Sequence, residues 1–227
     1  MLLKHSLYII TGANRGFGKA IAETIAAKAK NKTTVVLVGR DASQLERAKE
    51  AQETVIDKLD QLLKSWKETD VAPITNAYLI NNAGSIGDLS KKISDYTVSE
   101  IQDYVSFNIS SYVALISGFI RLLNNGLIEL TVVNISSLLA VQAFSHFGLY
   151  ATGKSARDML LQVLAKEEPS IRALSYAPGP LDNEMQQHLR ETVGDPEQRE
   201  LYTKAKKEVV FSQQVMPTAG KERIRIW

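Results

Sequence analysis

The chain of 227 residues contains no cysteine. This absence excludes disulfide bonds, catalytic thiolates and thiolate zinc sites. It fits a cytoplasmic location, which we expect, because disulfides form in oxidising compartments. The opening residues MLLKHSLYII lead directly into a glycine-rich turn, so we also expect no signal peptide.

An excess of charge of one sign is also lacking. The 27 lysines and arginines nearly balance 25 aspartates and glutamates, and a formal charge of +2 is too weak to attract nucleic acid or a membrane surface. The longest apolar run, near residues 112–120, is too short to span a bilayer. No metal-ligand spacing links the three histidines. We therefore expect no nucleic-acid partner, no membrane association and no metal.

What is present is an alternation of short apolar strands and helical patterns. The predicted strands are Ser6–Ile10, Thr33–Val38, Ala77–Ile80, Leu130–Ile135 and Ile171–Tyr176. Helical spacing of apolar residues follows each of the first four. Such alternation predicts a doubly wound parallel sheet. A chain of this length without a linker or repeat predicts a single α/β domain over 1–227.

A glycine-rich segment, TGANRGFG, stands between the first strand and its helix. Glycines at Gly12, Gly16 and Gly18 would let the backbone approach a pyrophosphate closely. They would also leave the free N–H groups of the helix N-terminus aimed at that pyrophosphate. The segment therefore favours dinucleotide binding. An ordinary tight turn remains the alternative.

The end of the second strand indicates which dinucleotide is bound. A fold that prefers NAD places an acid there, whereas a basic residue suits the 2′-phosphate of NADP. Arg40 lies at the strand end and Arg15 lies in the glycine turn, and two guanidiniums that converge on a phosphate favour NADP. Asp41 is the counter-argument, although the N-cap of the following helix is its commoner role.

A second set of polar residues lies between Asn134 and Lys154. Tyr150 and Lys154 are four residues apart, so they share one face of the helix predicted from Tyr150 to Glu167. A lysine ammonium beside the phenol should lower the pKa of Tyr150 from its usual value of about 10, so that it exchanges a proton with a carbonyl oxygen. Ser137 could hold the same oxygen by a hydrogen bond. A Tyr and Lys pair on a helix surface is the bland alternative.

Two helical patterns are unusual. The apolar spacing from Leu45 to Trp66 is uninterrupted, and at ~1.5 Å per residue it predicts one helix longer than ~30 Å, with no strand inside it. Asn108 lies in the middle of a helix predicted from Val98 to Leu123. An asparagine inside a helix more often points to solvent.

Together these motifs resemble those of the short-chain dehydrogenase/reductase family. The resemblance rests on TGANRGFG, NNAG at 81–84, Asn108, Ser137, YATGK at 150–154 and the Pro178-Gly179 turn, in that family's order. It implies that Tyr150 is the general acid and that Ser137 binds the substrate carbonyl. It also implies that Lys154 holds the nicotinamide ribose and tunes Tyr150. Asn108 would bend its helix and carry a water toward Lys154, which reverses the solvent interpretation.

The resemblance also implies the binding residues and the reaction. The cofactor would lie against Gly12, Ala13, Asn14, Arg15, Gly16, Phe17, Gly18, Arg40, Asp41, Asn82, Lys154, Leu181, Asp182, Met185 and Gln186. The substrate would lie against Ser137, Tyr150 and Gly179. NADPH would reduce side-chain carbonyls of a pterin in tetrahydrobiopterin synthesis. The implied setting is a cytoplasmic homodimer.

The sequence departs from the family's pattern in two places. Between Arg40 and Ala77 the family has a third strand, with an acid beside the adenine, where this chain has only the long helical pattern. After about Val210 the segment FSQQVMPTAGKERIRIW matches neither the family's last strand nor its pterin-anchoring aspartate. The alternative function is thus a catalytically impaired or regulatory NADP-binding variant that dimerises without turnover.

These departures predict a Rossmann-like doubly wound sheet that lacks one strand at each edge. In spatial order the strands would be Thr33–Val38, Ser6–Ile10, Ala77–Ile80, Leu130–Ile135 and Ile171–Tyr176. Residues 1–84 would form the cofactor half, shortened after 40, residues 85–210 the catalytic half, and residues 211–227 a divergent tail. Two bare borders predict self-association beyond a dimer. The alternative is that the long helix or the tail IRIW folds back over an edge.

Overall fold

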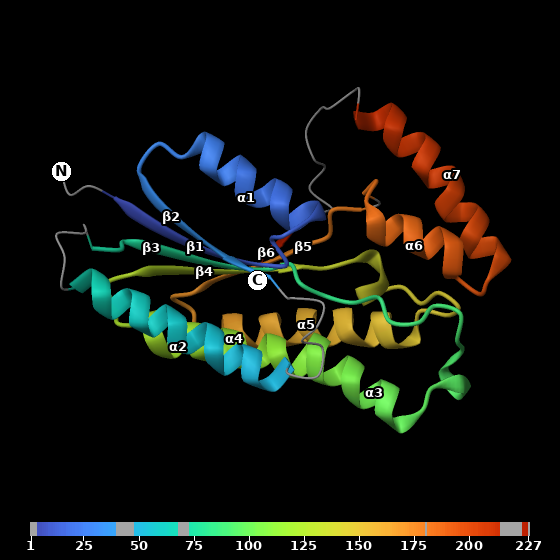
Figure 1. The fold of residues 1–227 in the computed structure, drawn as a ribbon, viewed down its shortest axis with the longest axis horizontal. Coiled ribbons are helices and arrows are strands. Elements are labelled where there is room, and N and C mark those ends of the chain that lie inside the picture. The colour runs from blue at the N-terminus through green and yellow to red at the C-terminus, as the bar shows by residue number, and fades with distance from the viewer. Residues whose placement is uncertain (1–3, 40–47, 68–72, 180, 214–223, 227) are drawn as a thin grey trace.

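The centre of the molecule is a twisted sheet (Figure 1). A computed structural model describes residues 4–39, 48–67, 73–179, 181–213 and 224–226. The strands are β1 (His5–Thr11), β2 (Lys32–Val38), β3 (Asn76–Asn81), β4 (Glu129–Ile135), β5 (Arg172–Tyr176) and β6 (Ile224–Ile226), in the spatial order β2-β1-β3-β4-β5-β6. The first five are parallel and stand in the predicted order, which confirms the doubly wound α/β fold.

Helices cover both faces of this sheet. They are α1 (Gly16–Lys28), α2 (Ala48–Lys67), α3 (Val98–Val105), α4 (Ser111–Leu123), α5 (Gly148–Glu167), α6 (Glu184–Thr192) and α7 (Pro196–Gln213), with short turns η2 (Ile93–Asp95), η3 (Ser106–Ser110) and η4 (Leu138–Ala140). α1 lies on one face, and α2, α4 and α5 lie on the other (Figure 1). This arrangement follows from the parallel strands, because each connection between them needs a crossover.

The main hydrophobic core lies between the sheet and the layer of α2, α4 and α5. Its fully buried side chains include Leu7, Leu79 and Val132 of the strands and Phe119 and Leu161 of the helices. Burial of each such side chain contributes about 1.5–3 kcal/mol. The core therefore fixes the strands as a platform and holds their carboxyl ends along one edge.

The long helix predicted between the second and third strands is confirmed over α2, which shows no strand among its described residues. α2 packs against α4 at a point where Gly118 permits close approach, because a Cβ on Gly118 would lie 2.6 Å from the Ile56 side chain. One helix thus carries the chain from β2 across β1 to β3. The predicted start at Leu45 lies outside the described residues.

The two borders of the sheet differ. β2 is the outer strand on one side, as predicted, and no described strand pairs with its free edge. On the other side β6 pairs antiparallel with β5, with Leu174 opposite Ile226. The prediction of a bare border near Ile171 to Tyr176 is therefore wrong. Ile224–Ile226 of the tail pair with the backbone of β5, which was the alternative.

The helix predicted from Val98 to Leu123 is interrupted by η3, a π-helical turn that contains Asn108. By length and composition this segment could cross a membrane, yet Tyr112 and Phe119 bury its inner face against the sheet. The Asn108 side chain is 3 % exposed, so the solvent interpretation is wrong. The irregular helix that the resemblance implied is the arrangement observed.

Candidate active site

The candidate residues follow the carboxyl ends of β1, β3, β4 and β5. β1 leads into the glycine turn, β3 into the segment 82–84, β4 into the loop that ends at α5, and β5 into the loop before α6. Because these strands are parallel and adjacent, all four loops meet at one edge of the sheet. Open α/β sheets bind ligands at this edge.

Two positions of the glycine turn, Gly12 and Gly18, leave no room for a Cβ atom. Gly12 has a φ of +65°, and a Cβ there would lie 2.9 Å from Nδ2 of Asn82. A Cβ on Gly18 would lie 2.4 Å from the carbonyl oxygen of Gly12. The Asn82 amide donates to the carbonyl oxygens of Thr11 and Gly12 at 3.1 and 3.2 Å. Asn82 therefore holds the glycine turn against the end of β3.

The N-terminus of α1 is open to an anion. The helix begins at Gly16 without a side-chain cap from Arg15 and without an acidic residue in its first turn. Its first N–H groups therefore have no intrahelical partner, and the helix dipole adds partial positive charge there. Since the glycines also leave room for close approach, the turn fits the pyrophosphate of a dinucleotide.

The predicted cofactor residues after β5 lie across from this turn. Nη1 of Arg15 lies 2.6 Å from Oε2 of Glu184, at the start of α6. Gln186 donates its backbone N–H to the Asn183 side chain at 3.0 Å, which caps α6. The neighbours Leu181, Asp182 and Met185 stand on the same short segment. The structure therefore brings the two predicted cofactor segments together.

Of the two arginines predicted to bind the 2′-phosphate, only Arg15 lies among the described residues. Arg15 faces a carboxylate, Glu184, and both side chains are more than two-thirds exposed. Arg40 and Asp41 lie outside the described residues, so their predicted roles stay predictions. Solvent-exposed ion pairs of this kind contribute only about 0–1 kcal/mol. A phosphate could therefore displace Glu184 from Arg15 at small cost.

The predicted catalytic residues converge at the end of β4. Ser137 caps η4, where its hydroxyl accepts from the N–H of Leu139 at 3.3 Å, and it lies close enough to Tyr150, in the first turn of α5, to lower the pKa of that phenol. Nζ of Lys154 lies 5.6 Å from the centre of the Tyr150 ring. The same ammonium donates to the carbonyl oxygen of Ile135 at 2.6 Å. The hydroxyl pair thus stands beside a buried lysine that the strand backbone holds in place.

The pKa of Tyr150 is raised, which is opposite to the predicted direction. Burial disfavours the phenolate, and this outweighs the hydrogen bond from Ser137 and the charge of Arg157, which lower the pKa. Burial and then the charge of Arg157 lower the pKa of Lys154 to about 7, so this lysine carries only part of a charge at neutral pH. The prediction was wrong because it left out the burial of the phenol, which is the largest cause of the shift. A raised pKa keeps Tyr150 protonated, as a general acid requires.

Both side-chain polar atoms of Asn108 and its main-chain carbonyl oxygen form hydrogen bonds. Its Oδ1 accepts from the N–H of Ser85 at 2.8 Å, and its Nδ2 donates to the carbonyl oxygen of Tyr104 at 3.1 Å. Its own carbonyl oxygen accepts from Nε of Arg157 at 2.6 Å. The water implied between Asn108 and Lys154 stays a prediction.

A buried carboxylate that the sequence reasoning missed lies behind Lys154. Asp158 accepts from Nδ2 of Asn134 and Oγ of Ser136, each at 2.8 Å, and from the Ser175 hydroxyl. A sequence signal for Asp158 exists. Lys154, Asp158 and Leu161 share the buried face of α5 at spacings of four and seven residues, so charged side chains occupy positions where the helix faces the core.

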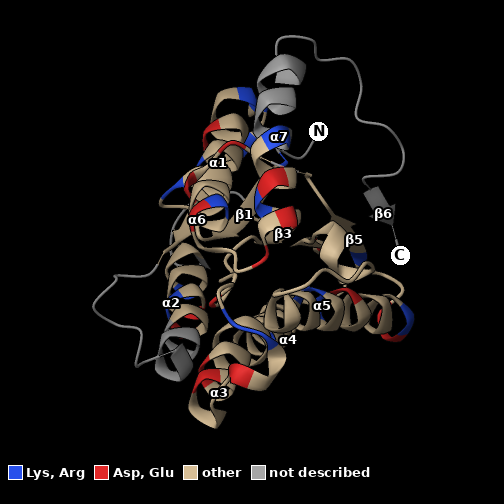
Figure 2. Ribbon diagram, turned by 90° about the vertical axis from the view of Figure 1, so that its right-hand side faces the viewer, with Lys and Arg blue, Asp and Glu red and all other residues tan. Residues whose placement is uncertain are grey.

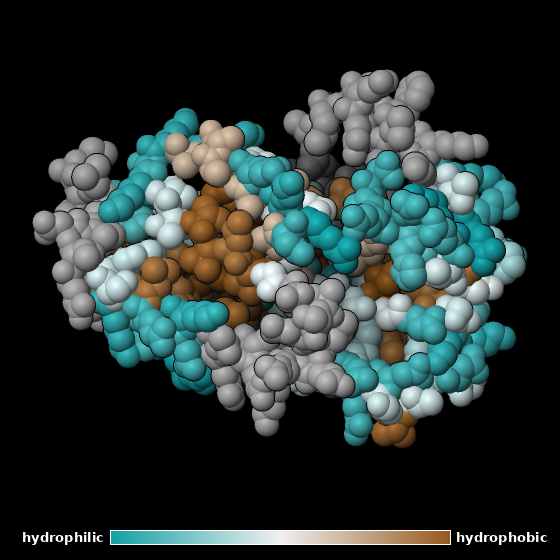
Figure 3. All heavy atoms as spheres, in the orientation of Figure 1, coloured by the Kyte–Doolittle hydropathy of each residue, from teal (hydrophilic) through white to brown (hydrophobic). Residues whose placement is uncertain are grey.

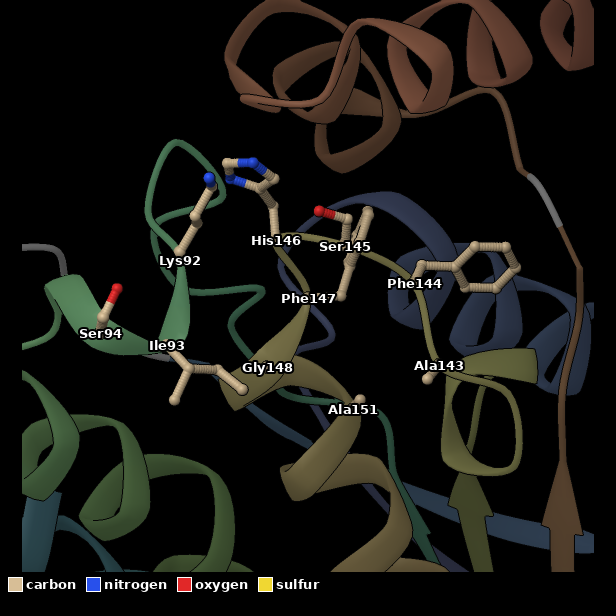
Figure 4. A pocket seen from close by; sticks show the side chains of 10 residues that line it. All are labelled: Lys92, Ile93, Ser94, Ala143, Phe144, Ser145, His146, Phe147, Gly148 and Ala151. Carbon is tan, nitrogen blue, oxygen red and sulfur yellow. The ribbon is translucent and has the colours of Figure 1, made fainter.

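Aromatic rings pack next to Tyr150. The Phe147 ring lies 6.3 Å from the Tyr150 ring and 5.9 Å from that of Tyr202, which belongs to α7 and was not predicted. Gly179, with a φ of +77°, turns the chain after β5. A cavity of about 540 Å³ opens on the far side of the Phe147 loop (Figure 4), lined by Lys92, Ile93, Ser94, Ala143, Phe144, Ser145, His146, Phe147, Gly148 and Ala151. Ser137, Tyr150 and Lys154 do not line that cavity.

Comparison with known proteins identifies this arrangement. The family model described as short chain dehydrogenase matches residues 6–194. The chain belongs to the short chain dehydrogenase family. It is 42 % identical over 219 residues to a sepiapterin reductase of Meriones unguiculatus, covering 88 % of this chain and 83 % of the relative. It is 43 % identical over 212 residues to a sepiapterin reductase of Rattus norvegicus, covering 84 % and 80 %.

Solved structures of short chain dehydrogenases show the same fold. One from Saccharomyces cerevisiae is 26 % identical, with a TM-score of 0.71, over 90 % of this chain and 83 % of that one. One from Shigella flexneri, solved with NADP, is 25 % identical, with a TM-score of 0.59, over 79 % of each chain. This short chain dehydrogenase is therefore an oxidoreductase that resembles sepiapterin reductase, in a family that binds nicotinamide dinucleotides. The family match ends before α7, so Tyr202 lies beyond it.

Proposed function

We propose that this chain is an NADPH-dependent carbonyl reductase that reduces side-chain keto groups of a pterin. The observation that carries the proposal is the convergence of Ser137, Tyr150 and Lys154 at the end of β4. The identity of about two residues in five to sepiapterin reductases supports the choice of a pterin.

The geometry supports different roles for the hydroxyls of Ser137 and Tyr150. The Ser137 hydroxyl lies close enough to Tyr150 to lower the pKa of its phenol, so a carbonyl oxygen that enters between the two hydroxyls can accept from both. NADPH, when bound, supplies the hydride for the carbonyl carbon. Tyr150 donates the proton to the oxygen, and its raised pKa keeps that proton available at neutral pH. Lys154, held by the Ile135 carbonyl, lies 5.6 Å from the centre of the Tyr150 ring and is the group that we expect to return a proton to Tyr150.

NADPH rather than NADH is the cofactor that the basic residues favour. Arg15 lies at the open N-terminus of α1, and Arg40 follows β2 in the sequence. Loss of a charge-assisted bond to a phosphate costs about 1.5–3 kcal/mol, or one to two decades in affinity. Arg40→Ala should therefore weaken NADPH binding and leave NADH binding nearly unchanged. Equal losses for both cofactors would show that Arg40 has a structural role instead.

A cytoplasmic homodimer is the setting we propose. Val113 of α4 is 39 % exposed, and Met159 and Val163 of α5 are 58 % and 39 % exposed, on helices that cover one face of the sheet. Such apolar side chains support a contact between two copies. Acidic and basic residues are interspersed along the helices (Figure 2), which favours neither nucleic acid nor a membrane surface as a partner.

The second candidate function is an impaired or regulatory NADP-binding variant. It is favoured by the passage from β2 to β3, in which α2 is the one helix among the described residues, and by a tail that lacks the family's pterin-anchoring aspartate. Both candidates require the glycine turn to bind NADPH. They differ in whether Tyr150 turns over a substrate.

One assay separates the two candidates. The absorbance of NADPH is followed with sepiapterin as substrate, for the wild type and for Tyr150→Phe, while quenching of tryptophan fluorescence reports NADPH binding. The reductase proposal expects a loss of about 10²–10⁴-fold in kcat for Tyr150→Phe, with NADPH affinity retained. A wild type that binds NADPH but is as inactive as Tyr150→Phe would support the regulatory variant.

A further inference from the structure

A buried arginine outside the expected catalytic set touches three parts of the active site. Arg157 is 3 % exposed and lies one helical turn after Lys154 in α5. Its Nε donates to the carbonyl oxygen of Asn108 at 2.6 Å. Its Nη1 donates to the carbonyl oxygen of Ala83 at 2.9 Å. The guanidinium lies 4.9 Å from the centre of the Tyr112 ring.

These contacts join the catalytic helix to the cofactor turn. Ala83 follows Asn82, whose side chain holds the carbonyls of Thr11 and Gly12. A continuous set of hydrogen bonds therefore runs from Arg157 to the glycine turn. The same guanidinium fixes the main chain of the π-helical turn η3, where the resemblance expects Asn108 to serve Lys154. A planar guanidinium suits this task because it donates in two fixed directions.

The charge of Arg157 also acts on Lys154. Arg157 and Lys154 are two buried cations one helical turn apart on α5. Burial and then Arg157 lower the pKa of Lys154, and the buried carboxylate Asp158, which accepts from Asn134, Ser136 and Ser175, raises it by less. An arginine stays protonated in proteins, so the lysine is the cation of this pair that can release its proton. The titratable groups that act on the pair are Asp158 and Tyr150 of α5, Tyr104 of α3 and Tyr112 of α4.

We propose that Arg157 is a positioning residue of the reductase site: its guanidinium fixes the Asn108 and Ala83 carbonyls, and its permanent charge sets how readily Lys154 carries a proton. The inference rests on the proposed reductase function. The direction agrees with the pKa of Lys154, which burial and Arg157 lower to about 7. A lysine that titrates near neutral pH can both accept a proton and pass it to Tyr150.

Two substitutions separate the charge of Arg157 from its packing. Arg157→Gln keeps a hydrogen-bond donor and removes the charge. Arg157→Lys keeps the charge but offers fewer hydrogen-bond donors, without the planar geometry of a guanidinium. The proposal expects Arg157→Gln to move the alkaline limb of the kcat profile upward by about 1 pH unit. It expects Arg157→Lys to leave that limb in place, even if its kcat is lower. Parallel losses of activity and stability in both variants, with the limb unmoved, would overturn the proposal.

A readout without turnover distinguishes failure of this inference from failure of the reductase function. Lysine labelled with ¹³C at Cε gives the titration midpoint of Lys154 by NMR, assigned with Lys154→Met. The proposal expects a midpoint near neutral pH in the wild type and a higher one in Arg157→Gln. If the wild type lacks activity but the midpoint still moves, the reductase function fails and the role of Arg157 stands. If Arg157→Gln does not fold, a wild-type midpoint as high as that of an exposed lysine overturns the inference.

Discussion

The catalytic end and the cofactor end of the active-site edge differ in how deeply their charged groups are buried. At the catalytic end, the charged groups of Lys154, Arg157 and Asp158 are buried, and each is bonded to a backbone carbonyl or a buried hydroxyl. At the cofactor end, the charged pair Arg15 and Glu184 stands in solvent with both side chains more than two-thirds exposed.

This difference separates what each end can control. Buried charges interact strongly and cannot exchange their partners for water, so the catalytic end has its geometry and proton affinities set before any ligand arrives. Exposed charges are screened and exchange partners easily, so the cofactor end can yield Arg15 to a phosphate. Substitutions at the catalytic end should therefore change stability and kcat. Substitutions at the cofactor end should change affinity, in a manner that depends on salt.

The largest effect on stability is expected for Asp158→Asn. The substitution removes a buried carboxylate that accepts from Asn134, Ser136 and Ser175 and whose charge favours the protonated form of Lys154. Disruption of such a buried, hydrogen-bonded charge typically costs about 3–5 kcal/mol. Denaturant unfolding of the two proteins measures the loss. The matched control is Asp182→Asn, whose carboxylate is 40 % exposed and lies 3.6 Å from Nη2 of Arg190. The control should cost less than about 1 kcal/mol. Equal losses would show that burial does not distinguish the two ends.

The second prediction concerns pH. Burial lowers the pKa of Lys154 from 10.5 to about 7, so between these values the unfolded chain holds a proton that the folded chain has released. The free energy of unfolding should therefore rise with pH from about 7 to 9.5, by at most about 1.4 kcal/mol per pH unit, and this contribution is lost as the pH falls through 7.

Lys154→Met removes the titrating group and should flatten this part of the profile. Unfolding is best measured below the range where tyrosines ionise, since burial raises the pKa of Tyr150 and the resulting contribution has the opposite sign at high pH. A wild type and a Lys154→Met variant with the same slope would mean that Lys154 is charged in the folded protein.

The third prediction tests the border of the cofactor half. Hydrophobic side chains gather over the strands between α1 and α2 (Figure 3), and Leu37 of the outer strand β2 is 58 % exposed. Free edge strands of this composition pair with other chains. Leu37→Lys should reduce concentration-dependent self-association in size-exclusion chromatography, with a change in stability of less than about 0.5 kcal/mol.

The control for this third prediction is Leu127→Lys, the same substitution at a turn residue that is 84 % exposed and lies before β4. It should leave self-association unchanged. A similar reduction by both variants would indicate a general effect of added charge. The proposed dimer through α4 and α5 should survive both substitutions.

Local patterns predicted most of this architecture. The five strands, the long helix α2 and the shared face of Tyr150 and Lys154 follow from spacing within one element, and each is confirmed. The glycine turn follows from the space that its neighbours leave, which the crowding at Gly12 and Gly18 confirms. Such features depend on residues a few positions apart, which a sequence displays directly.

Features that depend on distant partners were predicted poorly. Asn108 is disfavoured in a helix by local propensity, yet Ser85 and Tyr104 bind both ends of its amide and keep it buried. The pKa of Tyr150 depends first on how deeply the phenol is buried, and then on Ser137 and Arg157, which lower it. The pairing of β6 with β5 joins segments about fifty residues apart, and the sequence offered it only as an alternative to a bare border. In each case tertiary contacts decided the outcome.

The smallest predicted effect lies at the exposed pair. Glu184 competes with a phosphate for Arg15, so Glu184→Gln should strengthen NADPH binding, by about two- to fivefold at low salt, because a solvent-exposed pair is worth at most about 1 kcal/mol. The gain should vanish at high salt, since exposed charges are then screened. Fluorescence titrations at two ionic strengths measure both. The control is Glu191→Gln, which makes the same charge change at the other end of α6, where Glu191 accepts from Gln187 at 2.9 Å. An equal gain in NADPH affinity for the control would show that the effect comes from net charge alone. A loss of NADPH affinity for Glu184→Gln would mean that this carboxylate itself contacts the cofactor.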